Sequence, residues 1–275
     1  MIFKKFRSSL LFHSVEHKEG EAILDVSDLS AAYNGNPALE NVTFRLNQGE
    51  RVAVVGPNGA GKSTLFKVIA GAMEASEGDV RVFGFKPGEH ICIAFVPQRS
   101  QVDLSFPATV SDVVMMGRVG KIGLLRWPRK LDWAKVAESL ELVGLEDLND
   151  RPIGELSGGQ QQRMFIAQAL AQEADLILMD EPLTGLDAPS QEKILQILKE
   201  LQQRRITVMV ATHDLALARS SFDRVMLLNR RMLAFAEPDA ALGPDQLIAA
   251  YGNHMHVLPG ESGTLLMIED ECHDC

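Results

Sequence analysis

The stretch that decides the fold is Gly56-Pro57-Asn58-Gly59-Ala60-Gly61-Lys62-Ser63-Thr64. It fits the spacing G-x-x-x-x-G-K-[ST], in which the backbone N–H groups of a glycine-rich loop surround phosphate oxygens. A β-branched apolar run at 51–55 precedes it and indicates a buried strand, and 65–70 carries apolar residues at helical spacing. This order of strand, turn and helix predicts a loop that binds the phosphates of a nucleotide triphosphate.

The residue types in this loop explain how it would bind phosphate. Glycine adopts unusual backbone conformations at low cost, so the loop can turn its N–H groups toward an anion. The start of the next helix adds unpaired N–H groups and the positive end of its dipole. Lys62 can reach the outer phosphates, and the Ser63 hydroxyl can bind Mg²⁺. An ordinary glycine-rich turn is the alternative, but the flanking strand and helix argue against it.

The composition excludes several classes of protein. The chain has 275 residues, 46% of them hydrophobic, and a net charge of −10, which argues against non-specific binding to nucleic acid. No run approaches the length of about 18 apolar residues that a membrane-spanning helix needs. Three cysteines are too few for a disulfide framework and favour a reducing, cytosolic setting. The apolar part of residues 1–20 is too short for a secretory signal, so we expect an N-terminal extension there.

The hydrophobic pattern indicates an α/β protein. Alternating apolar and polar residues at 22–28 and 41–46 are typical of half-buried antiparallel strands. Continuous apolar runs at 175–180 and 206–211 are typical of central parallel strands, which are covered on both faces. Between these halves, 99 to about 155 has helical periodicity, and 131–143 places Trp133, Val136, Ala137, Leu140 and Val143 on one helix face. We therefore expect a mostly parallel sheet with an inserted helical subdomain.

Polar residues follow several of the expected strands. Asp180 and Glu181 end one buried run, Thr212 and His213 follow another, and Gln98 ends a third. In open α/β sheets, ligands bind at the carboxyl ends of parallel strands. Asp180 there can bind Mg²⁺, and Glu181 can orient and deprotonate the water that attacks a phosphate. His213 alone would more often be structural, but several strand ends that meet at one crevice favour a role in the site.

Two further features are ambiguous from their residues alone. Leu156-Ser157-Gly158-Gly159-Gln160 precedes a long helix, so it can be an anion-binding turn or a helix cap in a flexible segment. Tyr33 lies in a turn-rich segment, 31–37, and can either stack on a nucleotide base or pack at a strand end. The packing interpretation is favoured by the residue alone, because aromatic side chains usually bury area.

Together these motifs resemble the ATPase subunits of ABC transporters, across roughly residues 22–240. The resemblance rests on features in the family's order: Tyr33, the loop at 56–64, Gln98, LSGGQ at 156–160, Asp180-Glu181, Gly185-Leu186-Asp187 and His213. It implies a P-loop NTPase core with a small antiparallel β subdomain, an ATPase domain at 21–250, a helical subdomain at about 99–165 and a C-terminal tail at 251–275.

The resemblance also implies roles for single residues. Tyr33 would stack on the adenine, Gln98 would sense Mg²⁺ and water, Glu181 would be the general base and His213 would contact the γ-phosphate. Residues Ser157, Gly158, Gly159 and Gln160 would complete the ATP site of a second copy, and Asp187 would lie in the loop that crosses the dimer interface. The implied partners are a second ATPase subunit, integral-membrane permease subunits and, indirectly, an extracytoplasmic metal-binding protein, at the cytoplasmic face of the membrane. No nucleic acid is implied.

A single cassette without membrane helices resembles importers more than exporters. The segments 103–110 and 113–118 resemble the manganese, zinc and iron uptake group, with manganese slightly ahead of zinc. An importer of iron siderophores or cobalamin is the alternative. A soluble ABC ATPase acting on ribosomes or DNA fits less well, because such proteins usually carry two cassettes and basic contact surfaces. A binding module without chemistry is disfavoured because Lys62, Asp180, Glu181 and His213 are all present.

The C-terminal tail contains residue types that bind soft or borderline metals: His254, His256, Cys272, His273 and Cys275. Their spacing matches no known ligand pattern, so an ordinary surface tail is the favoured interpretation. A sensor of cytosolic metal is the alternative.

Overall fold

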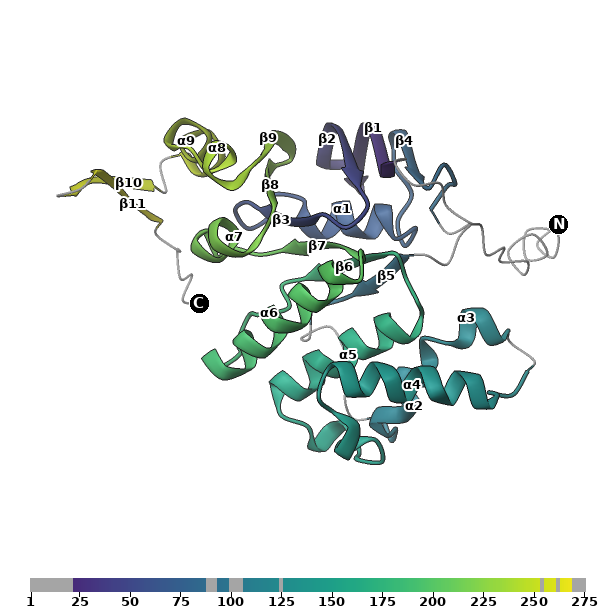
Figure 1. Ribbon diagram of the computed structural model, residues 1–275. Helices are drawn as coiled ribbons and strands as arrows, with labels where there is room; N and C mark the ends of the chain where they lie inside the picture. The colour runs from purple at the N-terminus through teal and green to yellow at the C-terminus, as the bar shows by residue number, and fades with distance from the viewer. Residues whose placement is uncertain are drawn as a thin grey trace.

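The computed structural model describes residues 22–87, 93–98, 106–123 and 126–252, and the backbone of 255–260 and 263–268. A six-stranded sheet crosses the middle of the molecule (Figure 1). A three-stranded antiparallel sheet lies above it with helix α1 between the two sheets, and a group of helices lies below (Figure 1).

The antiparallel sheet has the strand order β2-β1-β4, formed by β1 (Ala22–Tyr33), β2 (Asn36–Asn47) and β4 (Glu77–Val82). Asn34 and Gly35 connect β1 to β2 with φ values of 49° and 83°, as a two-residue hairpin turn with positive φ requires. The predicted strands at 22–28 and 41–46 are confirmed but are longer than expected. The turn expected within 31–37 is present but is confined to Asn34 and Gly35, because both strands continue up to it.

The central sheet has the strand order β5-β6-β7-β3-β8-β9. Its strands are β3 (Arg51–Val55), β5 (Ile93–Val96), β6 (Leu176–Asp180), β7 (Thr207–Ala211), β8 (Arg224–Asn229) and β9 (Arg231–Ala236). Each neighbouring pair from β5 to β8 is parallel, and β9 pairs antiparallel with β8 at one edge. The expected mostly parallel sheet is confirmed.

The continuous apolar strands contribute side chains to two hydrophobic cores, one on each face of the central sheet. In β3, Val52 and Val54 face the core that β1, β2 and α1 complete, whereas Ala53 and Val55 face the core on the helical side. The five residues of β6 are likewise all buried. Because side chains alternate between the two faces of a strand, a sheet covered on both sides needs apolar residues at every position.

Helices cover both faces of the central sheet. The helices of the described residues are α1 (Lys62–Ile69), α2 (Val110–Met116), α3 (Val119–Ile122), α4 (Lys130–Leu142), α5 (Gly158–Ala171), α6 (Ala188–Gln203), α7 (Leu215–Ser221), α8 (Pro238–Ala241) and α9 (Pro244–Tyr251), and α2, α3 and α4 belong to the group below the sheet (Figure 1). Short 3₁₀ turns η2 (Glu146–Leu148) and η3 (Ile153–Glu155) precede α5, and a hairpin of β10 (Met255–Gly260) and β11 (Gly263–Ile268) follows α9.

One predicted helix face was wrong at two positions, whereas Val136, Leu140 and Val143 are buried as expected. The sequence pattern placed Trp133 and Ala137 on the buried face of α4, but both are exposed and Trp133 keeps 48% of its surface. The buried face instead includes Asp132, which accepts hydrogen bonds of 3.2 Å from the buried Arg118 guanidinium. A charged residue is thus buried on this face with its partner, next to the apolar residues that the pattern placed there.

Candidate nucleotide site

The strand order brings the polar strand ends to one edge of the sheet. Strands β5, β6, β7 and β3 are consecutive neighbours, and all four are parallel. Their carboxyl ends carry Gln98, the pair Asp180-Glu181, the pair Thr212-His213 and the loop at 56–61. The expected meeting of these strand ends is confirmed by the sheet topology.

The glycine-rich loop is packed closely against its surroundings. Gly56 has its α-carbon so near β8 that an added Cβ would lie 2.0 Å from the carbonyl oxygen of Leu228. Gly61 has φ of 96°, and a Cβ there would lie 2.5 Å from the carbonyl oxygen of Ala38. Glycine is required at both positions, for the close approach at Gly56 and for both space and backbone conformation at Gly61.

Lys62 begins α1 and is only 7% exposed. Its Nζ donates hydrogen bonds of 2.7 Å to the carbonyl oxygen of Gly56 and 3.1 Å to that of Pro57. Burial lowers the pKa of the Lys62 ammonium, while the charges of Glu181 and Asp180 act to raise it. The loop carbonyls therefore hold the ammonium group within the curl of the loop, where phosphate oxygens would bind.

Ser63 and Asp180 form the pair expected to bind Mg²⁺. Asp180 is 3% exposed at the end of β6, and its carboxylate accepts a hydrogen bond from the Ser63 hydroxyl. Burial raises the pKa of Asp180, and the Ser63 hydrogen bond acts in the opposite direction. A carboxylate and a hydroxyl in contact are oxygen donors suited to a hard cation, so these residues fit Mg²⁺.

Glu181 has a left-handed backbone, with φ of 50°. Its N–H donates to the carbonyl oxygen of Ala211 at 3.0 Å, which ties it to the end of β7. Its Oε2 accepts a hydrogen bond of 3.1 Å from Gln98 Nε2. A glutamate in this conformation is strained, and such strain concentrates at functional sites.

Thr212 and His213 extend from the neighbouring strand. The N–H of Thr212 donates to the carbonyl oxygen of Val54 at 3.0 Å, so the end of β7 is joined to the end of β3. The buried Thr212 hydroxyl accepts a hydrogen bond of 3.1 Å from the Asp214 N–H. The exposed His213 is thereby placed at the same edge as Glu181.

The LSGGQ segment is not brought to this edge. Ser157 caps α5 by accepting a 3.3 Å hydrogen bond from the Gln160 N–H, and the Gln160 side chain accepts one of 2.8 Å from the Ser157 N–H. A Cβ on Gly159 would lie 2.3 Å from Ser190 Oγ, and Gly158 opens the helix. Helix α5 lies in the lower, helical part of the molecule, whereas α1 lies above the central sheet (Figure 1).

Tyr33 and Asp187, which are also expected to contact nucleotide, are exposed. Tyr33 is the last residue of β1 and is 46% exposed, so its ring is free to contact a ligand. Asp187 is the exposed N-cap residue of α6. Of the C-terminal histidines and cysteines, the side chain of His256 and all of His254, Cys272, His273 and Cys275 lie outside the described residues.

Two contacts of the site were missed from the sequence. The Thr184 hydroxyl lies 3.4 Å from Glu181 Oε2. The N–H of Arg230, in the β8–β9 turn, donates to the carbonyl oxygen of Ala60 at 2.8 Å, and its carbonyl accepts from the Glu40 N–H at 2.9 Å. Thr184 lies between Glu181 and Asp187, and this position could have indicated that it contacts the site. Nothing local in the sequence indicates that Arg230 reaches the loop.

These features define a class of protein, the phosphate-loop ATPases. Within that class, the chain belongs to the ABC transporter family. The family's sequence profile matches residues 39–184. The nucleotide of this family is ATP. In the part of the chain that the structure describes, no helix combines the length and apolar character needed to cross a bilayer.

Individual relatives are similar over most of the chain. The zinc transport system ATP-binding protein TroB of Treponema pallidum is 46% identical over 84% of this chain and 88% of its own. The manganese transport system ATP-binding protein MntB of Bacillus subtilis is 40% identical over 86% of this chain and 94% of its own. A solved structure described as an inward-facing putative metal-chelate type ABC transporter has a TM-score of 0.77 and 30% identity, and covers 90% of this chain and 98% of its own.

Proposed function

We propose that this chain is the ATP-hydrolysing subunit that powers an importer of a divalent transition metal, either manganese or zinc. The observation that carries this proposal is its 40–46% identity, over 84–86% of its length, to ATP-binding proteins named for manganese and zinc transport. The strand-end residues needed for hydrolysis are present together at one edge of the sheet.

The proposed roles follow from the positions of the side chains. Lys62, with the rest of the run Gly56 to Thr64, binds the phosphates, and Tyr33 stacks on the adenine. Ser63, Asp180 and Gln98 would hold Mg²⁺, which supplies positive charge beside the phosphates. Glu181 accepts a proton from the attacking water, and its hydrogen bond with Gln98 keeps its carboxylate directed at the site.

A second copy of the chain would complete each site. The backbone N–H groups at the start of α5 can donate hydrogen bonds to an anion. In this structure, however, the segment Ser157, Gly158, Gly159 and Gln160 lies apart from the phosphate loop of the same chain. Head-to-tail association of two copies would place these donors, and Asp187, at the other copy's nucleotide. Each chain would then contribute half of two sites.

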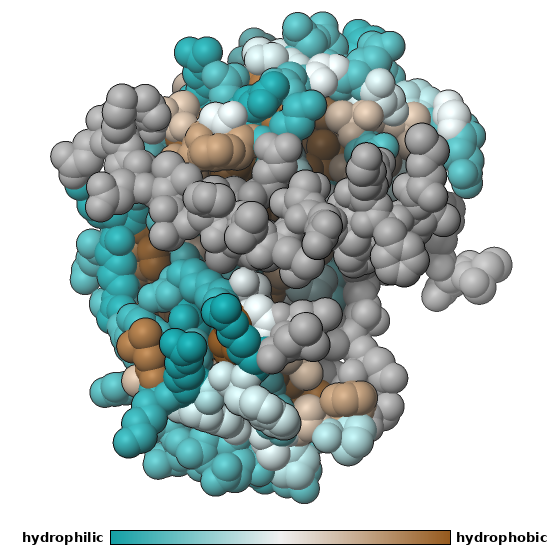
Figure 2. Space-filling model, turned by 90° about the vertical axis from the view of Figure 1, so that its right-hand side faces the viewer, coloured by the Kyte–Doolittle hydropathy of each residue, from teal (hydrophilic) through white to brown (hydrophobic). Residues whose placement is uncertain are grey.

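The helical part, about 99–165, is the proposed contact with integral-membrane permease subunits. Among the described residues, ten large apolar side chains are exposed, and six of them lie in this part: Phe106, Met116, Val119, Trp127, Leu131 and Trp133. Figure 2 shows apolar patches that interrupt the hydrophilic surface in the lower, helical half. Such patches are typical of protein contacts. The subunit would then act at the cytoplasmic face of the membrane and serve an extracytoplasmic metal-binding protein indirectly, with no nucleic acid as partner.

The test is metal uptake by a strain that lacks this chain. We expect the wild-type chain to restore manganese or zinc uptake, and the Glu181→Gln variant to fail at equal abundance. Restored uptake of a solute other than a metal, with metal uptake unchanged, would overturn the assignment.

Uptake of a metal chelate is the second candidate. It is favoured by the structural similarity to the putative metal-chelate type transporter and by 42% identity to the chelated iron transport system membrane protein YfeB of Yersinia pestis. Parallel uptake assays with the free ions and with iron chelates or cobalamin distinguish the two candidates.

A further inference from the structure

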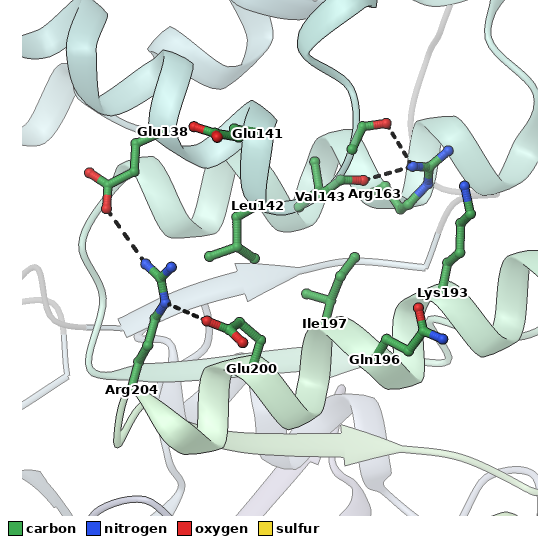
Figure 3. A pocket seen from close by; sticks show the side chains of 11 residues that line it. Glu138, Glu141, Leu142, Val143, Arg163, Lys193, Gln196, Ile197, Glu200 and Arg204 are labelled. Carbon is green, nitrogen blue, oxygen red and sulfur yellow. Dashed lines mark hydrogen bonds and ion pairs between the residues drawn. The ribbon is translucent and has the colours of Figure 1, made fainter.

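A cavity of about 570 Å³ lies away from the nucleotide site, between the helical part and α6 (Figure 3). One wall comes from the end of α4 and from α5, and the other comes from α6. Its size is within the range of pockets that hold small organic ligands. The residues that line it are Glu138, Glu141, Leu142, Val143, Gly144, Arg163, Lys193, Gln196, Ile197, Glu200 and Arg204.

Two cationic side chains meet at one end of this cavity. Arg163 is 9% exposed, and its Nη1 donates hydrogen bonds of 2.7 Å to the Val143 carbonyl and 2.9 Å to the Gly144 carbonyl. Lys193 extends toward the same guanidinium group from α6 (Figure 3). The carbonyls fix the guanidinium in place, and its other N–H groups have no acceptor among its described hydrogen bonds.

Neither of these two positive charges has an ion-pair partner in the part of the chain that the structure describes. Among the described residues, no salt bridge joins Arg163 or Lys193 to a carboxylate. Burial lowers the pKa of Arg163, and the charge of Glu146 acts to raise it. Arg163 is buried and Lys193 is exposed; two like charges that converge repel each other, and an anion between them would remove that repulsion.

The opposite end of the cavity holds paired charges and one further carboxylate, that of Glu141. Arg204 forms ion pairs of 3.5 Å with Glu138 and 3.2 Å with Glu200, and Glu138 also pairs with Lys135 at 3.1 Å. Glu141 lies beside Glu138 at that end, whereas Leu142 and Ile197 occupy the middle (Figure 3). The cavity therefore has one cationic end, an apolar middle and a paired or acidic far end.

We propose that the Arg163–Lys193 end binds the phosphate or carboxylate group of a small organic anion, whose apolar part lies against Leu142 and Ile197. Such a ligand would contact both α5 and α6. Helix α5 begins within LSGGQ, and α6 packs against β7 of the central sheet, so the ligand would link the helical part to that sheet. The site is separate from the phosphate loop, and the proposal does not depend on the identity of the transported solute.

The experiment is calorimetric titration of the purified chain with inorganic phosphate and, separately, with citrate. Saturating ADP is present throughout, so that the phosphate loop is already occupied, and Mg²⁺ is omitted because citrate chelates it. We expect at least one anion to bind the wild-type chain and Lys193→Gln to weaken that binding by roughly tenfold, as the loss of one charge-assisted hydrogen bond predicts. Lys199→Gln is the matched control, because Lys199 is an exposed lysine of the same helix that does not line the cavity.

Each outcome decides the proposal. If phosphate alone binds, the ligand carries a phosphate group; if citrate alone binds, the ligand carries a carboxylate. Both conclusions require that Lys193→Gln weakens the binding and Lys199→Gln does not. No binding of either anion to the wild-type chain at millimolar concentration overturns the proposal. An equal loss in both lysine variants also overturns it, because the effect would then come from general charge.

Discussion

Gln98 and Glu181, 83 residues apart in the chain, are joined by a hydrogen bond of 3.1 Å between Nε2 and Oε2. The contact arises because β5 and β6 are adjacent parallel strands, so that the residues just beyond them lie side by side. Glu181 is in the left-handed region, which turns its chain away from the course of β6. The pairing of the strands and this one strained residue together decide where the carboxylate lies.

Replacement of Glu181 by glutamine should separate binding from hydrolysis. The amide keeps the size of the side chain and a hydrogen-bonding partner for Gln98, so ATP binding should be retained. It cannot accept the proton of the attacking water, and kcat should fall by roughly a hundred- to ten-thousand-fold. Steady-state phosphate release and nucleotide titration measure the two effects, and the variant should accumulate as an ATP-bound dimer.

The exposed Glu192, on α6, provides the matched control, Glu192→Gln. That change should leave kcat near the wild-type value. Normal hydrolysis by Glu181→Gln would show that Glu181 is not the general base.

Much of the site could be predicted because its signals are local. The loop at 56–64 has a strand before it and a helix after it, and each is defined by residues within about ten positions. The buried face of α6, with Ile194, Ile197, Leu198 and Leu201, likewise follows from helical periodicity alone. The acids at the end of β6 stand out because four buried apolar residues lead to them.

Features that depend on distant contacts could not be predicted. The burial of Asp132 beside the exposed Trp133 is accompanied by an ion pair with Arg118, and a hydrophobic pattern does not predict such a pair. The contact of Arg230 with Ala60 depends on β8 lying beside β3, which is a pairing between segments far apart in the sequence. The left-handed backbone of Glu181 has no signature in its residue type.

Lys62→Ala should weaken nucleotide binding. The ammonium group is held in the loop by two carbonyl oxygens and would be replaced by a methyl group that carries no charge for the phosphates. Loss of one charged hydrogen-bond donor predicts an affinity for ATP lower by roughly ten- to a hundredfold. Fluorescent-nucleotide titration measures this, with the exposed Lys199→Ala as a control that should bind normally. Unchanged affinity in Lys62→Ala would argue against the site.

Two glycines of the loop should differ in their tolerance of alanine. A Cβ at Gly56 would meet the Leu228 carbonyl at 2.0 Å, so Gly56→Ala should lower the free energy of unfolding by about 3 kcal/mol or more. Gly59 has φ of 77° and no atom near its added Cβ, so Gly59→Ala should cost only about 1–2 kcal/mol of backbone strain. Urea unfolding of both variants measures the difference. Equal losses would contradict the close approach of the loop to β8.

Glu173 should make stability depend on pH. Burial acts to raise the pKa of its carboxyl, but hydrogen bonds from Lys121 and Arg118 and their charges outweigh burial and lower the pKa from 4.5 to about 2. A carboxyl with a lowered pKa in the folded state contributes stability above its unfolded pKa, and this contribution is lost as pH falls toward the folded value. Because the side chain is 38% exposed, solvent screening reduces the expected contribution to about 1 kcal/mol.

Glu173→Gln should therefore lower the free energy of unfolding at neutral pH, and the difference from wild type should shrink as pH falls below 4.5. Urea unfolding at a series of pH values measures this change. Glu141→Gln is the control, because Glu141 is exposed and forms no salt bridge among the described residues. The contrary outcome is a loss of unfolding free energy in Glu173→Gln that stays constant down to the lowest pH at which the chain is folded. Glu173 would then act through its shape, and its ion pairs with Arg118 and Lys121 would add no stability.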